Sequence, residues 1–225
     1  MQNLPDFTPR QFDLLIFDWD GTLMDSTGAI ATSIRAACAD LDLPVPSQEQ
    51  ASHIIGLGLV EAIAALLPTL AAADYPRLID RYRHHFLGQD HLLPLFGGVA
   101  EIMPQLRDAG YWVTVSTGKS RRGLERALDQ SGLRPCFHAT RCADEGFSKP
   151  HPGMILELMD YCGVLPERTL MIGDTSHDLQ MAQNAGVASV AAGYGAHCAS
   201  ALQAYEPLYI ADDFVALARW LSQYG

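Results

Sequence analysis

The feature that most constrains the fold is a set of short apolar runs. In these runs apolar and polar residues do not alternate, as they would in a strand with one face exposed to solvent. The first run, residues 14–17, is followed at once by Asp18, Asp20 and a glycine. Runs of similar character lie at 111–117, 169–175, 187–195 and 207–213, and each ends in small or polar residues. Such runs are typical of parallel strands that helices cover on both faces.

Helical patterns fill the intervals between these runs. They lie at 99–110, 121–132, 152–163 and 178–186, and each closes with a glycine suited to a helix C-terminus. A last pattern at 212–224 begins with aspartates, one of which is suited to cap the helix. The alternation predicts an α/β fold, with a Rossmann-like, doubly wound and mainly parallel sheet. In such sheets the binding site lies beyond the carboxyl ends of the strands.

One stretch interrupts the alternation and predicts a second domain. Residues 25–92 contain helical patterns and no convincing strand pattern, and the segment 94–101 is rich in Pro and Gly. We therefore expect an α/β catalytic core domain formed by residues 1–24 and 93–225. Residues 25–92 are expected to form an α-helical cap domain that roofs the site, since the insertion follows the first strand directly.

Charge and cysteine content exclude several classes of function. The net charge of −11 disfavours a nucleic-acid or anionic-membrane partner, because both favour clustered Lys and Arg. The five cysteines are odd in number and form no C-x-x-C pair, which argues against a disulfide framework or a zinc site. This cysteine pattern fits a reducing, cytoplasmic location better than an oxidising, extracellular one. Both a monomer and a homodimer stay open.

The two aspartates after the first run indicate a cation site. Asp18 and Asp20 both approach the end of one strand, and two close anions repel unless a cation neutralises them. Mg²⁺ is the natural partner, because hard divalent ions take oxygen ligands. A simple helix-capping role is the alternative. A calcium loop is disfavoured, because its twelfth position, which calls for Glu, is Ala29 here.

Polar residues at the other strand ends extend this site. Asp174 and Asp178 follow one apolar run, and Ser116 or Thr117 with Gly118 ends another, where hydroxyl and amide groups suit phosphate oxygens. Lys149, just before a proline, is a candidate counter-charge. These groups suit phosphoryl transfer. One carboxylate attacks phosphorus, and a second gives a proton to the leaving alcohol and later takes one from water.

At this point the sequence resembles the haloacid dehalogenase-like hydrolase superfamily, in the helical-cap (C1) branch. Within that branch it looks most like the phosphoglycolate phosphatase and β-phosphoglucomutase group. Four motifs carry the resemblance across essentially the whole chain: FDWDGTLMDS, VTVSTGKS, SKPHPG and IGDTSHD. Dehalogenases are expected to lack the aspartate at position 20, and the DKTGT sequence of P-type ATPases is absent. Phosphate-ester chemistry is therefore favoured.

The resemblance implies roles for the acidic residues. Asp18 would be the nucleophile and a Mg²⁺ ligand. Asp20 would be the general acid/base, with its backbone carbonyl on the metal. Asp174 would be the third protein ligand, and Asp178 would act indirectly, by orienting a bound water or Lys149.

The resemblance also implies a phosphate site. Lys149 would bind the phosphate and Asp18, while Thr117 and the N–H of Gly118 would bind phosphate oxygens, with Ser116 competing for the role of Thr117. Gly118 stands where many relatives carry Asn, so any side-chain contact there is lost. Lys119 or Arg122 is a further candidate cation, and His53 is a candidate contact from the cap.

The expected function is that of a Mg²⁺-dependent phosphatase acting on a small phosphorylated metabolite through an aspartyl phosphate. A β-phosphoglucomutase-like phosphomutase is the alternative, since it differs only in the fate of the aspartyl phosphate. A non-catalytic phosphate-binding protein is the alternative from another class.

Overall fold

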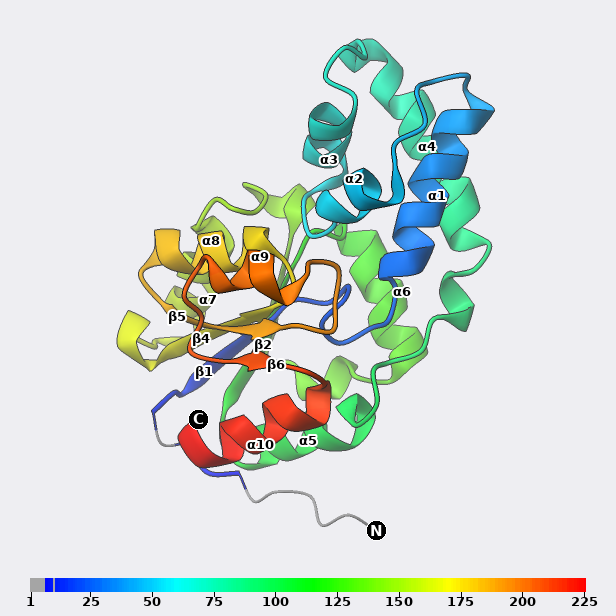
Figure 1. The fold of residues 1–225 in the computed structure, drawn as a ribbon. Helices are drawn as coiled ribbons and strands as arrows, with labels where there is room; N and C mark the ends of the chain where they lie inside the picture. Colours follow the sequence, from blue (N-terminus) through cyan, green and yellow to red (C-terminus); the bar gives the residue numbers. More distant parts are fainter. Residues whose placement is uncertain (1–6, 10) are drawn as a thin grey trace.

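The structure is a computed structural model that describes residues 7–9 and 11–225. Residues 1–6 and 10, which belong to the predicted core domain, lie outside the described residues. Figure 1 shows a layered part, in which helices cover a sheet, and a helical part standing over one edge of that sheet.

The layered part contains one sheet of six parallel strands in the order β3-β2-β1-β4-β5-β6. The strands are β1 (Leu14–Phe17), β2 (Trp112–Thr117), β3 (Ala139–Cys142), β4 (Thr169–Gly173), β5 (Ala188–Ala192) and β6 (Ile210–Ala211). Because β1 is central, its neighbours β2 and β4 end beside it. Phe17 pairs with Val115 on one side and with Ile172 on the other.

Alternate residues of β1 enter different hydrophobic cores. Leu15 and Phe17 pack in the cluster built with α5 (Val99–Asp108), α6 (Arg121–Ser131) and α10 (Phe214–Tyr224). Leu14 and Ile16 pack in the cluster built with α7 (Gly153–Cys162) and α8 (Ser176–Ala185). All four side chains are fully buried. Each such burial contributes about 1.5–3 kcal/mol relative to exposure. The unbroken apolar run is therefore explained by helices on both faces of the sheet.

The helices of the layered part lie between successive strands, except the last helix, which follows β6. They are α5 (Val99–Asp108), α6 (Arg121–Ser131), α7 (Gly153–Cys162), α8 (Ser176–Ala185), α9 (Ala199–Gln203) and α10 (Phe214–Tyr224). Gly132, Gly163 and Gly186 end α6, α7 and α8 in the left-handed conformation, as their sequence positions predicted. Asp213 caps α10, because its Oδ1 accepts a hydrogen bond of 2.6 Å from the backbone N–H of Ala216.

The helical part is built from α1 (Thr27–Asp40), α2 (Gln48–His53), α3 (Leu59–Leu66) and α4 (Tyr75–Leu87). It has its own hydrophobic cluster, in which Ile34 of α1, Ile63 of α3 and Leu78 of α4 are buried. In α2, the Oγ atom of Ser47 accepts from the backbone N–H of Gln50 while the Gln50 side chain bonds back to Ser47. This capping box starts a helix that the apolar pattern alone did not predict.

The predicted fold class is confirmed, with three elements added. The short elements β3, α2 and α9 were not predicted. The strand β3 is an edge strand and three of its four residues are only partly buried, so it lacks the long apolar run of the central strands. No helix in the described part of the chain is long and apolar enough to span a membrane.

Candidate active site

Three strand ends converge at the carboxyl edge of the sheet. Asp18, Thr117 and Asp174 follow or end the central strands β1, β2 and β4. The three strands are parallel and adjacent, so the residues that follow their paired positions emerge side by side. Acidic and hydroxyl groups from distant parts of the chain are thereby brought together.

Three carboxylates form a buried cluster at this edge. One oxygen from each of Asp18, Asp174 and Asp178 lies within 4.8 Å of the other two. The Nζ atom of Lys149 lies 2.7 Å from Asp18 Oδ1 and 2.6 Å from Asp178 Oδ1. Its side chain is fully buried, so it faces the two carboxylates in a medium of low dielectric constant. One ammonium group against three carboxylates leaves an excess of negative charge.

The donor set of this cluster fits Mg²⁺. Among the described residues, Asp18 Oδ2 is buried and has no hydrogen-bond partner, while Oδ1 of the same carboxylate lies 2.7 Å from Lys149 Nζ. Oxygen ligands are the ones that Mg²⁺ prefers, and a buried oxygen without a partner is costly unless a cation or a donor reaches it. Asp18 and Asp174 are thus suited to hold the ion.

The pKa values in the carboxylate cluster reflect its burial and its excess of negative charge. Burial raises the pKa of Asp18 to about 7, and Lys149 opposes this shift only in part. Burial also raises the pKa of Asp174 well above its ordinary value, and the charges of Asp18 and Asp178 add to the rise. Burial would lower the pKa of Lys149, but the neighbouring aspartates outweigh it and raise that pKa. Lys149 therefore stays charged.

The chain around Asp174 fixes the orientation of its carboxylate. Thr22 Oγ1 donates to Oδ1 over 3.2 Å, and the backbone N–H of Ala196 donates to Oδ2 over 2.7 Å. Two glycines make this approach feasible, because a Cβ atom at Gly21 or Gly195 would collide with the Asp174 carboxylate. Gly21 also has a φ of +82°, which favours glycine.

Asp20 lies in a different polar environment from the three clustered carboxylates. Its Oδ1 accepts a hydrogen bond of 2.6 Å from Ser26 Oγ and lies 2.9 Å from Lys119 Nζ. The Lys119 ammonium also lies 4.9 Å from the centre of the Phe86 ring, which belongs to α4 of the helical part. Asp20 is thus held by Ser26, just before α1, and by Lys119, after β2, and it lies where the helical part meets the layered part.

The two hydroxyls at the end of β2 have different partners. Ser116 Oγ lies against the sulfur atoms of Met154 and Met181, at 3.6 and 3.9 Å, in the core beneath the sheet. Successive strand residues point to opposite faces. Thr117 Oγ1 accepts a hydrogen bond of 3.2 Å from the backbone N–H of Lys119, in the loop that carries Gly118. This geometry favours Thr117 over Ser116 as a group near the carboxylates.

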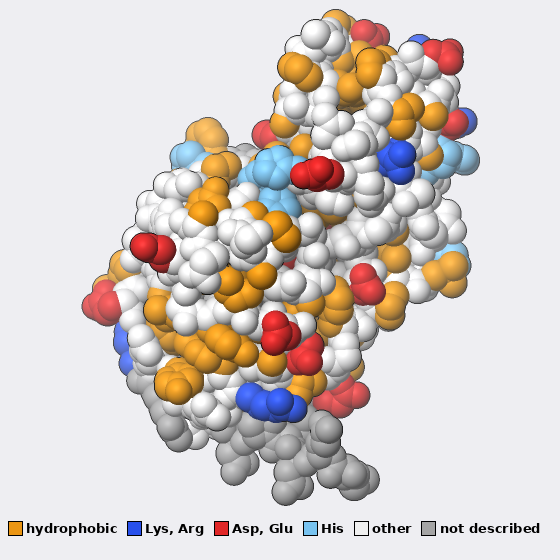
Figure 2. All heavy atoms as spheres, viewed as in Figure 1, with side chains coloured by type: hydrophobic (Ala, Val, Ile, Leu, Met, Phe, Trp, Pro, Cys, Tyr) orange, Lys and Arg blue, Asp and Glu red, His pale blue; other side chains and the backbone are white. Residues whose placement is uncertain are grey.

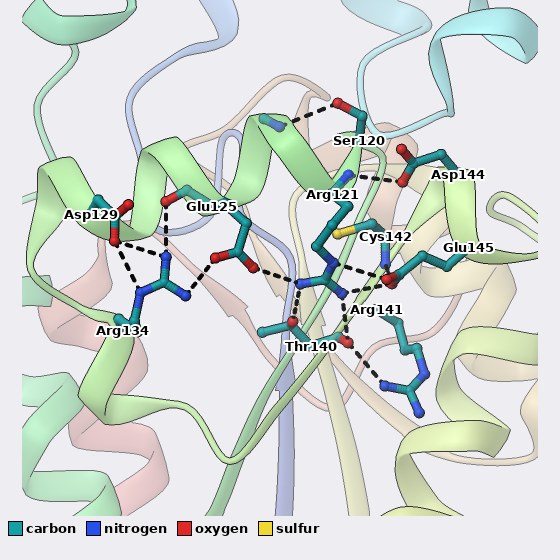
Figure 3. A network of polar contacts seen from close by, with 11 residues as sticks. Ser120, Arg121, Glu125, Asp129, Arg134, Thr140, Arg141, Cys142, Asp144 and Glu145 are labelled. Carbon is teal, nitrogen blue, oxygen red and sulfur yellow. Dashed lines mark hydrogen bonds and ion pairs between the residues drawn. The ribbon is translucent and has the colours of Figure 1, made fainter.

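A network of ion pairs ties the loop before Lys149 to α6 (Figure 3). The Arg121 guanidinium bonds both oxygens of Glu145, at 2.9 and 2.6 Å, and Thr140 Oγ1 at 2.6 Å. Glu145 Oε2 also accepts a hydrogen bond of 2.9 Å from the backbone N–H of Cys142. The hydrogen bond from Arg121 lowers the pKa of Glu145 despite partial burial. The start of α6, next to Lys119, is thereby fixed to the segment that leads to Lys149.

Comparison with known proteins identifies the family. Residues 15–192 match the sequence profile described as haloacid dehalogenase-like hydrolase, which is most of the 225-residue chain. The chain belongs to the haloacid dehalogenase-like hydrolases. The expectation that it is an enzyme of this superfamily is therefore confirmed.

Individual relatives of this haloacid dehalogenase-like hydrolase are named as phosphatases. It is 34% identical over 207 residues to the probable phosphatase IndB of Dickeya dadantii, covering 89% of this chain and 90% of the relative. It is 32% identical over 213 residues to a phosphoglycolate phosphatase of Agrobacterium fabrum, covering 91% and 90%. A crystal structure described as a predicted phosphoglycolate phosphatase of Haemophilus somnus has a TM-score of 0.82 at 26% identity, over 93% of this chain and 98% of that one.

Sequence reasoning about this hydrolase missed the groups that surround its aspartates. These are Ser26, Thr22 and the backbone N–H of Ala196. The ion pair between Lys119 and Asp20 was also missed, because the sequence offered Lys119 only as one of two candidate cations. One signal was available, because Lys119 and Lys149 are the only two lysines in the whole chain. The contacts to Asp174 span 152 and 22 residues of sequence, and no local pattern predicts them.

Proposed function

We propose that the protein is a Mg²⁺-dependent phosphatase that hydrolyses a small phosphomonoester through an aspartyl phosphate on Asp18. The single observation that carries this proposal is the state of the Asp18 carboxylate. One of its oxygens binds buried Lys149, and the other is unpartnered within a cluster of three carboxylates. A carboxylate in this position is a nucleophile with a cation site beside it.

In the first step an oxygen of Asp18 attacks phosphorus and the bond from phosphorus to the ester oxygen breaks. Asp20 gives its proton to that oxygen, so the product leaves as an alcohol. In the second step water attacks phosphorus, the acyl phosphate bond breaks, and Asp20 takes the proton of the water. Inorganic phosphate and the free Asp18 carboxylate result, and Asp20 again carries its proton.

The other site residues bind the phosphoryl group and offset its charge. Lys149, the hydroxyl of Thr117 and the backbone N–H of Gly118 are assigned to its oxygens. Asp18, Asp174 and the backbone carbonyl of Asp20 are assigned to Mg²⁺, which when bound supplies positive charge for the phosphoryl oxygens. Asp178 holds Lys149 in place through its ion pair of 2.6 Å.

We assign residues 25–92 to a cap domain over a core formed by residues 1–24 and 93–225. The separate hydrophobic cluster of the helical part supports this division. The substrate is a small phosphorylated metabolite rather than a nucleic acid or a membrane, acted on in the cytoplasm by a monomer or homodimer. The relatives named phosphoglycolate phosphatase make phosphoglycolate a first ester to assay.

Hydrolysis of p-nitrophenyl phosphate, acetyl phosphate and a panel of phosphate esters tests the proposal. We expect turnover with Mg²⁺, none in excess EDTA, and none for Asp18→Asn. Asp160→Asn, an exposed aspartate on α7, is the matched control and should keep full turnover.

Each alternative outcome has a distinct meaning. Unchanged turnover in EDTA would contradict the metal assignment. Accumulation of an isomerised sugar phosphate in the presence of a bisphosphate primer would identify a phosphomutase. Phosphate binding without turnover of any ester would identify a binding protein.

A further inference from the structure

A short loop of the helical part rests directly on the loops that carry the candidate catalytic residues. The loop comprises residues 53–58, at the end of α2 and before α3, and we call it the docking loop. Figure 2 shows histidine side chains gathered where the helical part meets the layered part. The rings of His53, His177 and His197 lie there, with centres 5.0 to 5.6 Å apart.

One backbone carbonyl of the docking loop accepts two imidazole donors. The carbonyl oxygen of His53 lies 2.9 Å from His177 Nε2 and 3.2 Å from His197 Nε2. The backbone N–H of Ser176 donates to His197 Nδ1 over 3.0 Å, so that nitrogen carries no proton and Nε2 is the donor. His177 lies in α8, which follows Asp174, and His197 lies in the loop after β5, next to Ala196, whose backbone N–H donates to Asp174. The docking loop is thus bonded next to the carboxylate cluster.

The other end of the docking loop is bonded next to Lys149. The backbone N–H of Gly58 donates to Ser148 Oγ over 2.7 Å, and both groups are buried. Between the two ends, Gly56 has a φ of +94°, and a Cβ there would lie 2.9 Å from Thr175 Oγ1. The same Thr175 hydroxyl donates to Asp178.

Gly118 leaves room for this contact. A Cβ atom at Gly118 would collide with the backbone carbonyl groups of Gly56 and Leu57. Backbone atoms of the docking loop and of the loop after β2 therefore lie close together, and no side chain separates them. A residue larger than glycine at position 118 therefore requires the docking loop or the loop after β2 to move.

We propose that His177 and His197 are positioning residues that hold the docking loop closed over the phosphoryl site, and that Gly118 is the residue that permits this closure. The inference rests on the proposed function. The closed loop restricts the space above Asp18 to a small leaving group. Esters with bulky leaving groups are then disfavoured by the loop and not by the phosphate-binding residues.

Hydrogen–deuterium exchange of the full-length protein with Mg²⁺ measures loop closure without reference to catalysis. The first variant is His177→Ala combined with His197→Asn, because the Asn oxygen still accepts from Ser176 while the Nε2 donor is lost. Loss of two neutral hydrogen bonds should speed exchange of residues 54–60 by about tenfold. Gly118→Ala, which acts from the opposite side of the contact, should have the same effect.

Two controls separate docking from general destabilisation. His91→Ala removes an exposed imidazole of the helical part and should leave exchange and turnover unchanged. His177→Gln supplies an amide donor in place of Nε2, and exchange should return close to that of the parent protein. Exchange in β1 and β4 should not change in any variant.

Turnover gives the second readout. In the double variant, kcat/KM for p-nitrophenyl phosphate relative to ethyl phosphate should rise by about tenfold, because the aromatic ester gains most from an open loop. Parent-like exchange of residues 54–60 in both the double variant and Gly118→Ala would overturn the inference, and so would equal acceleration throughout the sheet. If no ester is hydrolysed by the parent protein, the proposed function fails, whereas the exchange result still decides whether the loop docks as described.

Discussion

The ammonium group of Lys149 lies 2.7 Å from Asp18 Oδ1, and both side chains are buried. Removal of the ammonium in Lys149→Met leaves buried carboxylates without their counter-charge. We expect the metal-free protein to lose about 3–5 kcal/mol of its free energy of unfolding. We expect kcat/KM to fall by a factor on the order of 10²–10³, since a preorganised charge at the phosphoryl group is lost. Urea denaturation in EDTA and steady-state assays measure the two effects. A variant with full activity would contradict the role assigned to Lys149.

Asp174→Asn separates the metal site from the fold. A ligand that binds only the folded protein stabilises it by about 2.7 kcal/mol at a concentration of 100 times its dissociation constant. We expect saturating Mg²⁺ to stabilise the parent protein accordingly and Asp174→Asn to lose this gain. Without metal the variant should be at least as stable as the parent, because one of three clustered carboxylates becomes neutral. Denaturation curves with and without Mg²⁺ provide the comparison, and an undiminished Mg²⁺ effect would exclude Asp174 as a ligand.

Asp20→Asn should affect esters according to their leaving groups. A p-nitrophenolate ion leaves readily without a proton, whereas an alkoxide needs one from a general acid. Loss of general acid catalysis typically costs about 10²–10⁴-fold. We expect kcat/KM to fall by about that factor for ethyl phosphate and by much less for p-nitrophenyl phosphate. Equal losses for both esters would show that Asp20 does not protonate the leaving group.

Glu145→Gln tests the network of Figure 3 through its pH dependence. The pKa of Glu145 is lowered in the folded protein, with the hydrogen bond from Arg121 as the largest cause. A carboxylate whose pKa is lowered by folding makes its full contribution to stability at pH values above its unfolded-state pKa. This contribution is lost as the pH falls through its folded-state pKa. Because the pair is about one-third exposed, we expect the variant to be only about 0.5–1 kcal/mol less stable at pH 7.

The difference in free energy of unfolding between the parent protein and Glu145→Gln should become smaller as the pH falls below 4.5, the ordinary pKa of Glu. Unfolding by urea at several pH values measures it. A difference that stays constant down to acid pH would assign the stabilisation to packing instead of to the charge of Glu145.

The central part of the fold is predictable because its signals are local. The apolar run of β1 and the glycines after α6, α7 and α8 each report on a few neighbouring residues. The strand β3 was missed because partly buried Ala139 and Arg141 carry no such run. The helix α2 was missed because its signal is the Ser47–Gln50 capping box and not an apolar stripe.

The candidate site likewise contains residues that the sequence predicts and contacts that it does not predict. Residues that end strands, such as Asp18 and Asp174, follow from the rule that ligands bind at the carboxyl edge of a parallel sheet. The contact between His53 and His177 spans 124 residues and joins a loop to a helix, so no periodic pattern in the sequence predicts it. The role of Gly118 in that contact likewise depends on a neighbouring backbone that only the folded chain places there.

The confinement of both lysines to the candidate active site has a practical consequence. Lys119 faces Asp20 and Lys149 faces Asp18, while every other basic side chain apart from histidine is an arginine. Isotopic enrichment of lysine alone therefore gives an NMR spectrum with one ammonium signal for each candidate catalytic aspartate. Occupancy of the centre by ions or esters can then be followed at two atoms, without any probe attached to the protein.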